Sequence, residues 1–442
     1  MSLIASITRG ELENITDIDA VQLFAATFAA ELTRLKSASA TVESGSTLPP
    51  GCLGSQGDTP SRFILEDDFP EVNRTLISML AVKWLLQDDY VSFTNGQKTD
   101  GKLSAESFQR LRGLLLARLP NADDIYAFLV LMVVDDIGKD PHLLDEAATT
   151  TGGTDTMNHS EAVFAAAKLG LIPALKTLPP SFQNDVLRAL DVGARLNISQ
   201  LAQAETVPAA LNCLSDMHGR ARFWDMRVMA TFLDVAGAAA HANARGCVAM
   251  TESVFQTYMT TTNILEEFVC GRIDSPRACY DSILQARAEV LLQDGFAALS
   301  TMTGDDGRAF LRLLCMARVV VNEQAGLFAQ AFSDLPPAVK QNLVNGLNVD
   351  GVSDGIAIVP YYAPGLWAET LRNTADKTDT SLVRAISAFM RFLARVFDGS
   401  RSQPGEPGAV VERDLSFAQA TIKAVDFRAN PDVLDEIGLP WE

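Results

Sequence analysis

Apolar residues recur three or four positions apart along most of the chain, the spacing that places them on one face of an α-helix. The strand-like alternation of apolar and polar residues is nearly absent. The pattern predicts an all-α, large multi-helix globular fold, with helices over the ranges 21–35, 72–86, 105–119, 125–136, 160–169, 181–196, 220–241, 252–268, 277–299, 307–332, 337–347 and 381–397.

Three segments interrupt this periodicity. Residues 37–61 are rich in Ser, Gly, Thr and Pro, which predicts a flexible loop or lid, and residues 399–410 predict a second flexible loop. In 346–365, turn residues surround a short apolar run, which predicts at most one short hairpin or an ordered loop. No linker divides the chain, so residues 1–442 are expected to form a single helical unit, with two closely packed lobes as the alternative.

Net charge, the length of apolar stretches and the cysteines indicate the cellular compartment and exclude some kinds of partner. The 36 basic and 55 acidic residues give a net charge of −19, which opposes long-range attraction to nucleic acid or to anionic lipid, so an RNA partner would need a local basic patch. The longest apolar stretch, 127–134, is shorter than the roughly 20 residues of a membrane helix. Six cysteines without CxxC spacing indicate free thiols. The sequence therefore predicts a cytoplasmic protein with neither a DNA nor a membrane partner.

The first candidate site follows the most apolar helix. Ten consecutive apolar or aromatic residues, 125–134, lead into Asp135 and Asp136 at the helix end, where the helix dipole disfavours negative charge. The two acids therefore need partners. Lys139, Arg220 or Arg222 could pair with them, or they could bind a cationic substrate or act as acid and base.

The second candidate lies on the predicted helix 220–241 and just before it. At 100° per residue, His218, Arg222 and Asp225 fall on the apolar face of this helix, where polar groups must be paired or functional. The opposite face carries a stripe at heptad spacing, made of Arg220, Arg227, Asp234 and His241. This stripe is either merely solvated or a basic contact for a phosphate backbone or a docking lobe.

A third candidate is the acidic run that contains Asp67, Asp68 and Glu71. Acids ahead of a helix are ordinary capping residues, but this run also fits a site for a metal or for arginine.

Two enzyme signatures are incomplete. Asp136 to Lys139 resembles the HDIGK motif of HD-type metal phosphohydrolases, with His159, His218, Asp234 and His241 downstream, but Asp135 stands where that motif has histidine. A metal would lose ligands, so no bound metal and no cofactor are expected. Asp135, Asp136 and Asp140 also form the DDxxxD pattern of class I terpene cyclases, but the second motif of that class is missing.

Five blocks, 133–143, 158–173, 196–211, 216–241 and 345–364, together resemble a fungal family of arginine-containing cyclodipeptide synthases. The resemblance implies a tRNA-dependent enzyme of a biosynthetic pathway that joins arginine and a second amino acid into a diketopiperazine. Its partners would be arginyl-tRNA and a second charged tRNA.

This activity needs an acidic pocket for a guanidinium, a proton shuttle and contacts to the tRNA end. Under that hypothesis the substrate is bound by Asp135, Asp136, Asp67, Asp68 and Glu71, catalysis uses His218, Asp225 and Lys139, and the tRNA end meets Arg220, Arg222 and Arg227. The alternatives are a degenerate HD-type phosphohydrolase and a non-catalytic helical scaffold. In a scaffold, Asp135 and Asp136 would form ion pairs with arginines.

Overall fold

A computed structural model describes residues 2–39, 48–54, 57–151, 158–300, 303–402 and 408–441. Helices dominate these residues, which confirms the predicted large multi-helix fold. The chain divides into two compact units, each built from two chain segments: unit 1 is Met1–Arg195 with Arg220–Met259, and unit 2 is Leu196–Gly219 with Thr260–Glu442. Among the described residues, no helix is both long and apolar enough to cross a membrane.

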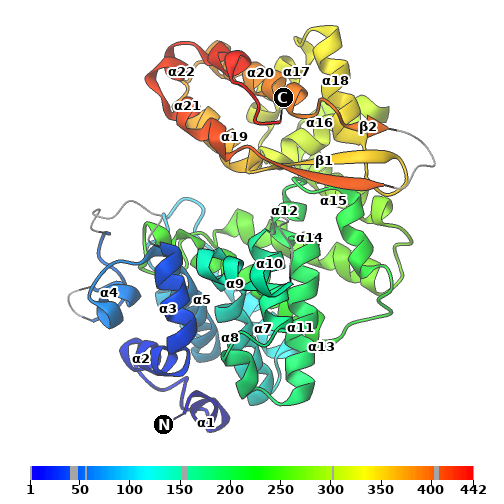
Figure 1. The fold of residues 1–442 in the computed structure, drawn as a ribbon. Helices are drawn as coiled ribbons and strands as arrows, with labels where there is room; N and C mark the ends of the chain where they lie inside the picture. The colour runs from blue at the N-terminus through cyan, green and yellow to red at the C-terminus, as the bar shows by residue number, and fades with distance from the viewer. Residues whose placement is uncertain are drawn as a thin grey trace. The chain divides into compact units, whose positions relative to one another are not determined.

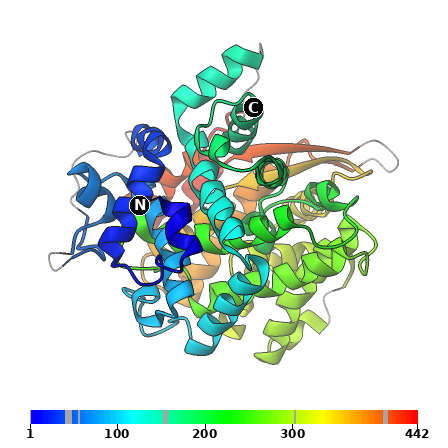
Figure 2. The ribbon, with the colours of Figure 1, turned by 90° about the horizontal axis from the view of Figure 1, so that it is seen from below.

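Unit 1 is wholly helical in the part that is described, and its helices can be followed from the blue N-terminus in Figures 1 and 2. They are α1 Leu3–Thr8, α2 Asp17–Thr27, α3 Ala29–Ser39, α4 Pro60–Leu65, α5 Pro70–Gln87, α6 Tyr90–Phe93, α7 Ala105–Arg118, α8 Ala122–Asp135, η1 Ile137–Lys139, α9 Pro141–Thr151, α10 His159–Lys168, η2 Ala174–Thr177, α11 Pro180–Arg195, α13 Arg222–Gly237 and η4 Ala238–His241. Helix α14, Glu252–Val269, begins in unit 1 and ends in unit 2.

The core of unit 1 is built around α5, α8 and α13. Residues 126–134 of α8 are buried, and so are Met229, Phe232 and Leu233 of α13, whereas Ile125, the first residue of the apolar run, is only partly buried. Helices α5 and α13 approach closely at Gly237, where a Cβ atom would lie 2.1 Å from Ser78 Oγ and 2.5 Å from the Arg74 carbonyl oxygen. Close packing of these helices brings their polar residues together at one end of the core.

Unit 2 contains helices and one small sheet. The helices are α12 Ile198–Ala202, η3 Pro208–Leu214, α15 Pro276–Gln293, η5 Ala297–Ser300, α16 Gly304–Met316, α17 Asn322–Ser333, α18 Pro337–Asn348, α19 Ala363–Asn373, α20 Asp379–Val396, η6 Ser416–Ala418, α21 Gln419–Lys423, α22 Val425–Ala429 and η7 Pro431–Glu436. Their core surrounds Trp367 of α19, whose ring centroid lies 5.0 Å from that of Phe328 and 4.3 Å from that of Phe389.

The sheet corrects two predictions. Strand β1 (Gly355–Tyr361) pairs in parallel with β3 (Ala409–Asp414) and antiparallel with β2 (Arg401–Ser402), so 346–365 contributes one strand to a three-stranded sheet and forms no hairpin of its own (Figure 1). Parallel pairing requires a long crossover, which α19 and α20 supply. The predicted flexible loop 399–410 contains β2 and the start of β3, and its residues 403–407 lie outside the described part.

The predicted loop or lid at 37–61 is also only partly a loop. Helix α3 continues to Ser39, Leu53 and Asp58 form an antiparallel bridge, and α4 begins at Pro60. Residues 40–47 and 55–56 of this segment lie outside the described part.

Candidate functional site

The polar residues at one end of α5, α8 and α13 form an ionic network within unit 1. Glu71 and Arg74 lie in the first turns of α5, Asp136 caps the C-terminus of α8, and Lys139 ends the short helix η1. Asp234 and His241 come from the ends of α13 and η4. Gly138 permits the close packing of η1, because a Cβ there would lie 2.0 Å from the His159 carbonyl oxygen.

Lys139 joins the two predicted acids Asp136 and Glu71. Its Nζ lies 3.0 Å from Asp136 Oδ1 and 2.6 Å from Glu71 Oε2. Thr75 Oγ1 donates to Asp136 Oδ2 at 3.0 Å, so both oxygens of this buried carboxylate have partners. Burial would raise the pKa of Asp136, but the charges of Arg74 and Lys139 hold it well below its usual range.

Glu71 also binds an imidazole. His241 Nε2 lies 3.1 Å from Glu71 Oε1, and the His241 side chain is 40% exposed, whereas that of Glu71 is 12% exposed. Burial would raise the pKa of Glu71, but the contact with His241 and the charge of Lys139 lower it to about 2. Glu71 is therefore ionised at neutral pH and fixes the position of a partly exposed histidine.

Arg74 links the network to α13. Its Nε lies 3.1 Å from Asp234 Oδ1, to which Nη2 also donates, and its Nη1 lies 3.9 Å from Asp136 Oδ1. Apart from His241, the network holds three carboxylates, Glu71, Asp136 and Asp234, and two cations, Arg74 and Lys139. Its carboxylates exceed its lysine and arginine side chains by one.

The second predicted acid, Asp135, is paired separately. Arg227 Nη1 lies 3.0 Å from Asp135 Oδ2, and the Arg227 side chain is only 11% exposed. The Arg227 guanidinium fits here because Gly193 has no side chain: a Cβ at that position would lie 2.5 Å from Nη1. Arg227 therefore joins α13 to the C-terminal end of α8, and most of its side chain is covered.

The acidic run divides between two places. Glu71 belongs to the network, whereas Asp68 pairs with Arg62 and accepts from Thr59 Oγ1 at 2.6 Å, and the exposed Asp67 accepts from the Asp68 amide. No hydrogen bond or ion pair joins Asp67 or Asp68 to the network among the described residues. They do not cap α5 either, because its N-cap is Phe69 and has no side-chain cap.

The predicted polar trio on α13 is not a trio. Helix α13 begins at Arg222, so His218 lies in the preceding loop and belongs to unit 2. Asp225 accepts from Arg118 Nη1 at 2.6 Å and from Arg220 Nη2 at 2.8 Å. Both of these partners are cations, so Asp225 has the environment of a structural carboxylate.

Arg220 and Arg222 are both paired and partly exposed. The Arg220 side chain is 42% exposed, and that of Arg222, which contacts Asp124 and Asp185 and stacks on Phe182, is 40% exposed. Of the three predicted tRNA contacts, these two are the more exposed.

Sequence reasoning did not identify Arg74, and it assigned His241 to a solvated stripe. That interpretation of the stripe is wrong for three of its members, because Arg227, Asp234 and His241 pair with Asp135, Arg74 and Glu71. One signal was available: Glu71, Arg74, Thr75 and Ser78 are polar at spacings of three and four along a largely apolar helix.

The comparison with protein families covers nearly the whole chain. Residues 21–434 match a family described as a family of unknown function, DUF6829. The chain belongs to the DUF6829 family. No curated protein and no solved structure matches the chain.

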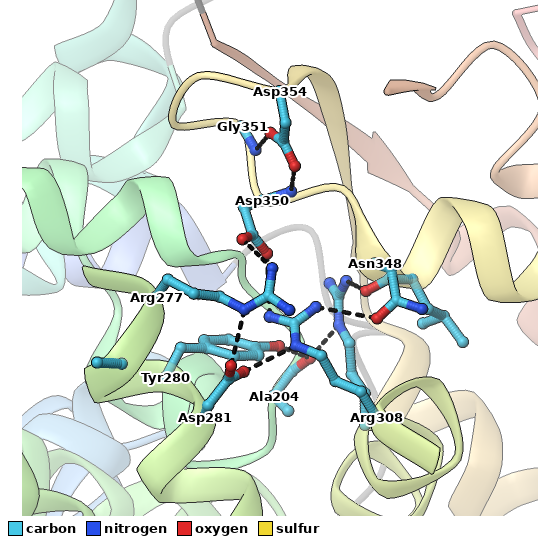
Figure 3. Close-up of polar contacts among 12 residues, drawn as sticks. Ala204, Arg277, Tyr280, Asp281, Arg308, Asn348, Asp350, Gly351 and Asp354 are labelled. Carbon is cyan, nitrogen blue, oxygen red and sulfur yellow. Dashed lines mark hydrogen bonds and ion pairs between the residues drawn. The ribbon is translucent and has the colours of Figure 1, made fainter. Parts of the chain in front are cut away.

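A second ionic cluster of this DUF6829 chain lies in unit 2 (Figure 3). Arg277 and Arg308 each contact both Asp281 and Asp350, so two arginines and two aspartates alternate in a closed ring. Asp354 accepts from the amides of Asp350 and Gly351 at 2.9 Å each and fixes the turn before β1. The charges of the ring balance, and it holds α15, α16 and this turn together.

Metal ligands do not cluster in the part of the DUF6829 chain that the structure describes: no group of three His, Cys, Asp or Glu side chains there could hold an ion. Asp136, which opens the motif similar to that of HD-type phosphohydrolases, is bound instead by Lys139 and Thr75.

Proposed function

We propose that the chain is a tRNA-dependent cyclodipeptide synthase that forms an arginine-containing diketopiperazine from aminoacyl-tRNAs. The observation that supports this best is the contact between Glu71 and His241, in which an ionised, largely buried carboxylate holds a partly exposed imidazole. A carboxylate in this position orients the ring so that it can take and return a proton, as general acid–base catalysis requires.

In this proposal His241 takes and returns the proton of the amine. The α-amino nitrogen of one aminoacyl ester attacks the carbonyl of the other, an amide bond forms, the ester C–O bond breaks, and the proton passes to the departing ribose hydroxyl. The second amine then attacks the remaining ester in the same way. Two amide bonds replace two ester bonds, so the reaction needs no oxidant and no nucleoside triphosphate.

The excess of carboxylates in the network supports a cationic substrate. The carboxylates of Glu71, Asp136 and Asp234 outnumber the cations Arg74 and Lys139, and a guanidinium would restore the balance. Arg220 and Arg222, each about 40% exposed, are the available contacts for the tRNA phosphates. The net charge of −19 makes such local contacts necessary.

The test is expression in a bacterial host, whose charged tRNAs are present, followed by mass spectrometry of the medium. We expect an arginine-containing cyclic dipeptide, whose formation in vitro requires charged tRNA and stops after ribonuclease treatment. His241→Ala should lower product formation by about 100-fold or more, the usual contribution of a general base. His142→Ala, which removes an exposed histidine of the same unit, is the control and should leave the yield unchanged.

A second candidate function is supported by a specific observation. Asp135 forms an ion pair with Arg227, and Asp136 forms ion pairs with Arg74 and Lys139. Such pairing is expected of a non-catalytic helical scaffold. Wild-type protein that is folded but forms no diketopiperazine from arginyl-tRNA and any second charged tRNA would favour the scaffold. A fully active His241→Ala variant would show that another residue is the general base.

A further inference from the structure

The segment after α12 carries a buried carboxyl group that the proposed reaction does not use. Glu205 of unit 2 is 5% exposed, and its Oε1 accepts the backbone N–H of Tyr362 at 2.6 Å. Tyr362 joins β1 to α19 as the N-cap of α19, with a left-handed backbone (φ 77°). This hydrogen bond therefore ties the segment after α12 to the junction of β1 and α19.

Glu205 has no cationic partner among the described residues, although two arginines are near its segment. The guanidinium of the buried Arg312 donates to the carbonyl oxygens of Ala204, Glu205 and Thr206, and Arg318 Nε donates to Gln203 Oε1 at 2.8 Å. Both arginines are thus held by other acceptors. An ionised carboxylate buried without a cation is strongly disfavoured, so this group tends to bind a proton.

The other charges that face Glu205 leave this conclusion unchanged. Burial is the main influence and raises the pKa of Glu205 to about 7; the negative charge of Glu412 on β3 acts in the same direction. The Tyr362 N–H and the charge of Arg318 oppose it and favour the ionised form, but they are weaker. Protonation of Glu205 therefore changes near neutral pH.

We propose that Glu205 is a proton-operated latch, closed on the Tyr362 amide when the carboxyl is protonated and released when it ionises. The ionised carboxylate gains hydration only by leaving its buried position, so ionisation favours opening of the junction of β1 and α19. Opening frees the N-terminus of α19 and the residues Tyr361 and Tyr362. This inference stands apart from the proposed catalytic activity, because it concerns unit 2 alone.

Hydrogen exchange at Tyr362, measured on the full chain by mass spectrometry, tests the latch. Between about pH 5 and pH 7 the opening constant, corrected for intrinsic base catalysis, should rise roughly 40-fold, since over most of this range the open form is ionised whereas the closed form keeps its proton. Glu205→Gln keeps a neutral acceptor for the amide and should abolish this rise. Glu289→Gln, an exposed carboxylate on α15, is the control and should behave as the wild type.

A wild-type opening constant that does not change with pH, or a rise that persists in Glu205→Gln, would overturn the proposal. If Glu205→Gln does not fold, infrared difference spectroscopy of the wild type decides the question. A protonated-carboxyl band should disappear with a midpoint near pH 7, as the pKa of about 7 for Glu205 requires. Absence of such a band contradicts the latch.

Discussion

Glu71 shows how one side chain decides the chemistry of its surroundings. It is nearly buried, yet it contacts both Lys139 and His241, so its negative charge has two partners in the folded state and none in the unfolded chain. These contacts lower the pKa of Glu71 from 4.5 to about 2. A lowered pKa means that the ionised group stabilises the fold above the unfolded pKa and that this contribution disappears as the pH falls to 2.

We therefore predict a pH-dependent cost of Glu71→Gln. At neutral pH the substitution should lower the free energy of unfolding by roughly 2–3 kcal/mol, and below the folded pKa of about 2 the two proteins should converge because both side chains are then neutral. Urea denaturation at several pH values measures this. Glu106→Gln, at an exposed position of α7, should change stability little at any pH. An equal cost at neutral and acid pH would contradict the assigned role of Glu71.

The residues of this network could be predicted from the sequence only in part. Asp136 stood out because an acid at the end of a very apolar helix needs a partner, Lys139 as one such partner, and Glu71 as part of an acidic run; the three do converge. Arg74 could not be found in this way, since nothing in the sequence states that α5 lies against α13 at Gly237. His218 was placed with Asp225 by assuming that one helix continued through 220, whereas α13 begins at Arg222.

At the scale of elements, apolar periodicity identified the long helices but not their interruptions. The predicted helix 307–332 is two helices, because Arg318 adopts a left-handed backbone and the amides of Arg318 and Val319 bond back to Cys315 and Leu314. This helix C-terminal motif usually has Gly at the left-handed position. Here that position is Arg318, so nothing in the sequence indicates that the helix ends. Helix α19 was missed because Pro364 and Gly365 indicated a turn, although proline is well tolerated in a first helical turn. The pairing of β1 with β3 joins segments about 50 residues apart, and local patterns do not encode such pairing.

Two glycines in helices of unit 1, one tightly packed and one open to solvent, predict opposite effects of substitution by alanine. Gly237→Ala should destabilise by about 1–3 kcal/mol, because its Cβ would overlap the Arg74 carbonyl oxygen and Ser78 where α13 crosses α5. Gly113→Ala on α7 meets nothing within 4 Å and should stabilise by about 0.5–1 kcal/mol through higher helix propensity. Thermal unfolding of both variants measures the contrast. A neutral Gly237→Ala would mean that the two helices separate easily there.

At the scale of the whole molecule, each compact unit is assembled from two distant segments of chain. In unit 2 the short segment 196–219 supplies acceptors to buried groups of the longer one. Tyr280 Oη donates to the carbonyl oxygens of Ala204 and Thr206 at 3.0 Å each. Arg312, which is fully buried, donates to the same two carbonyls and to that of Glu205. The longer segment therefore has buried donors that only the shorter one satisfies.

This dependence predicts that residues 260–442 do not fold alone. Without 196–219, Arg312 keeps only the Leu347 carbonyl as an acceptor, and a buried guanidinium that loses its other hydrogen bonds costs on the order of 5 kcal/mol, comparable with the whole stability of a domain. Adding a peptide of residues 196–219 should restore a cooperative thermal transition, followed by circular dichroism. A Val207→Asp peptide is the control: Val207 is fully buried, so it should fail to restore the transition. Cooperative unfolding of 260–442 without any peptide would show that the buried donors find other acceptors, and that the shorter segment is an addition to unit 2 that its fold does not require.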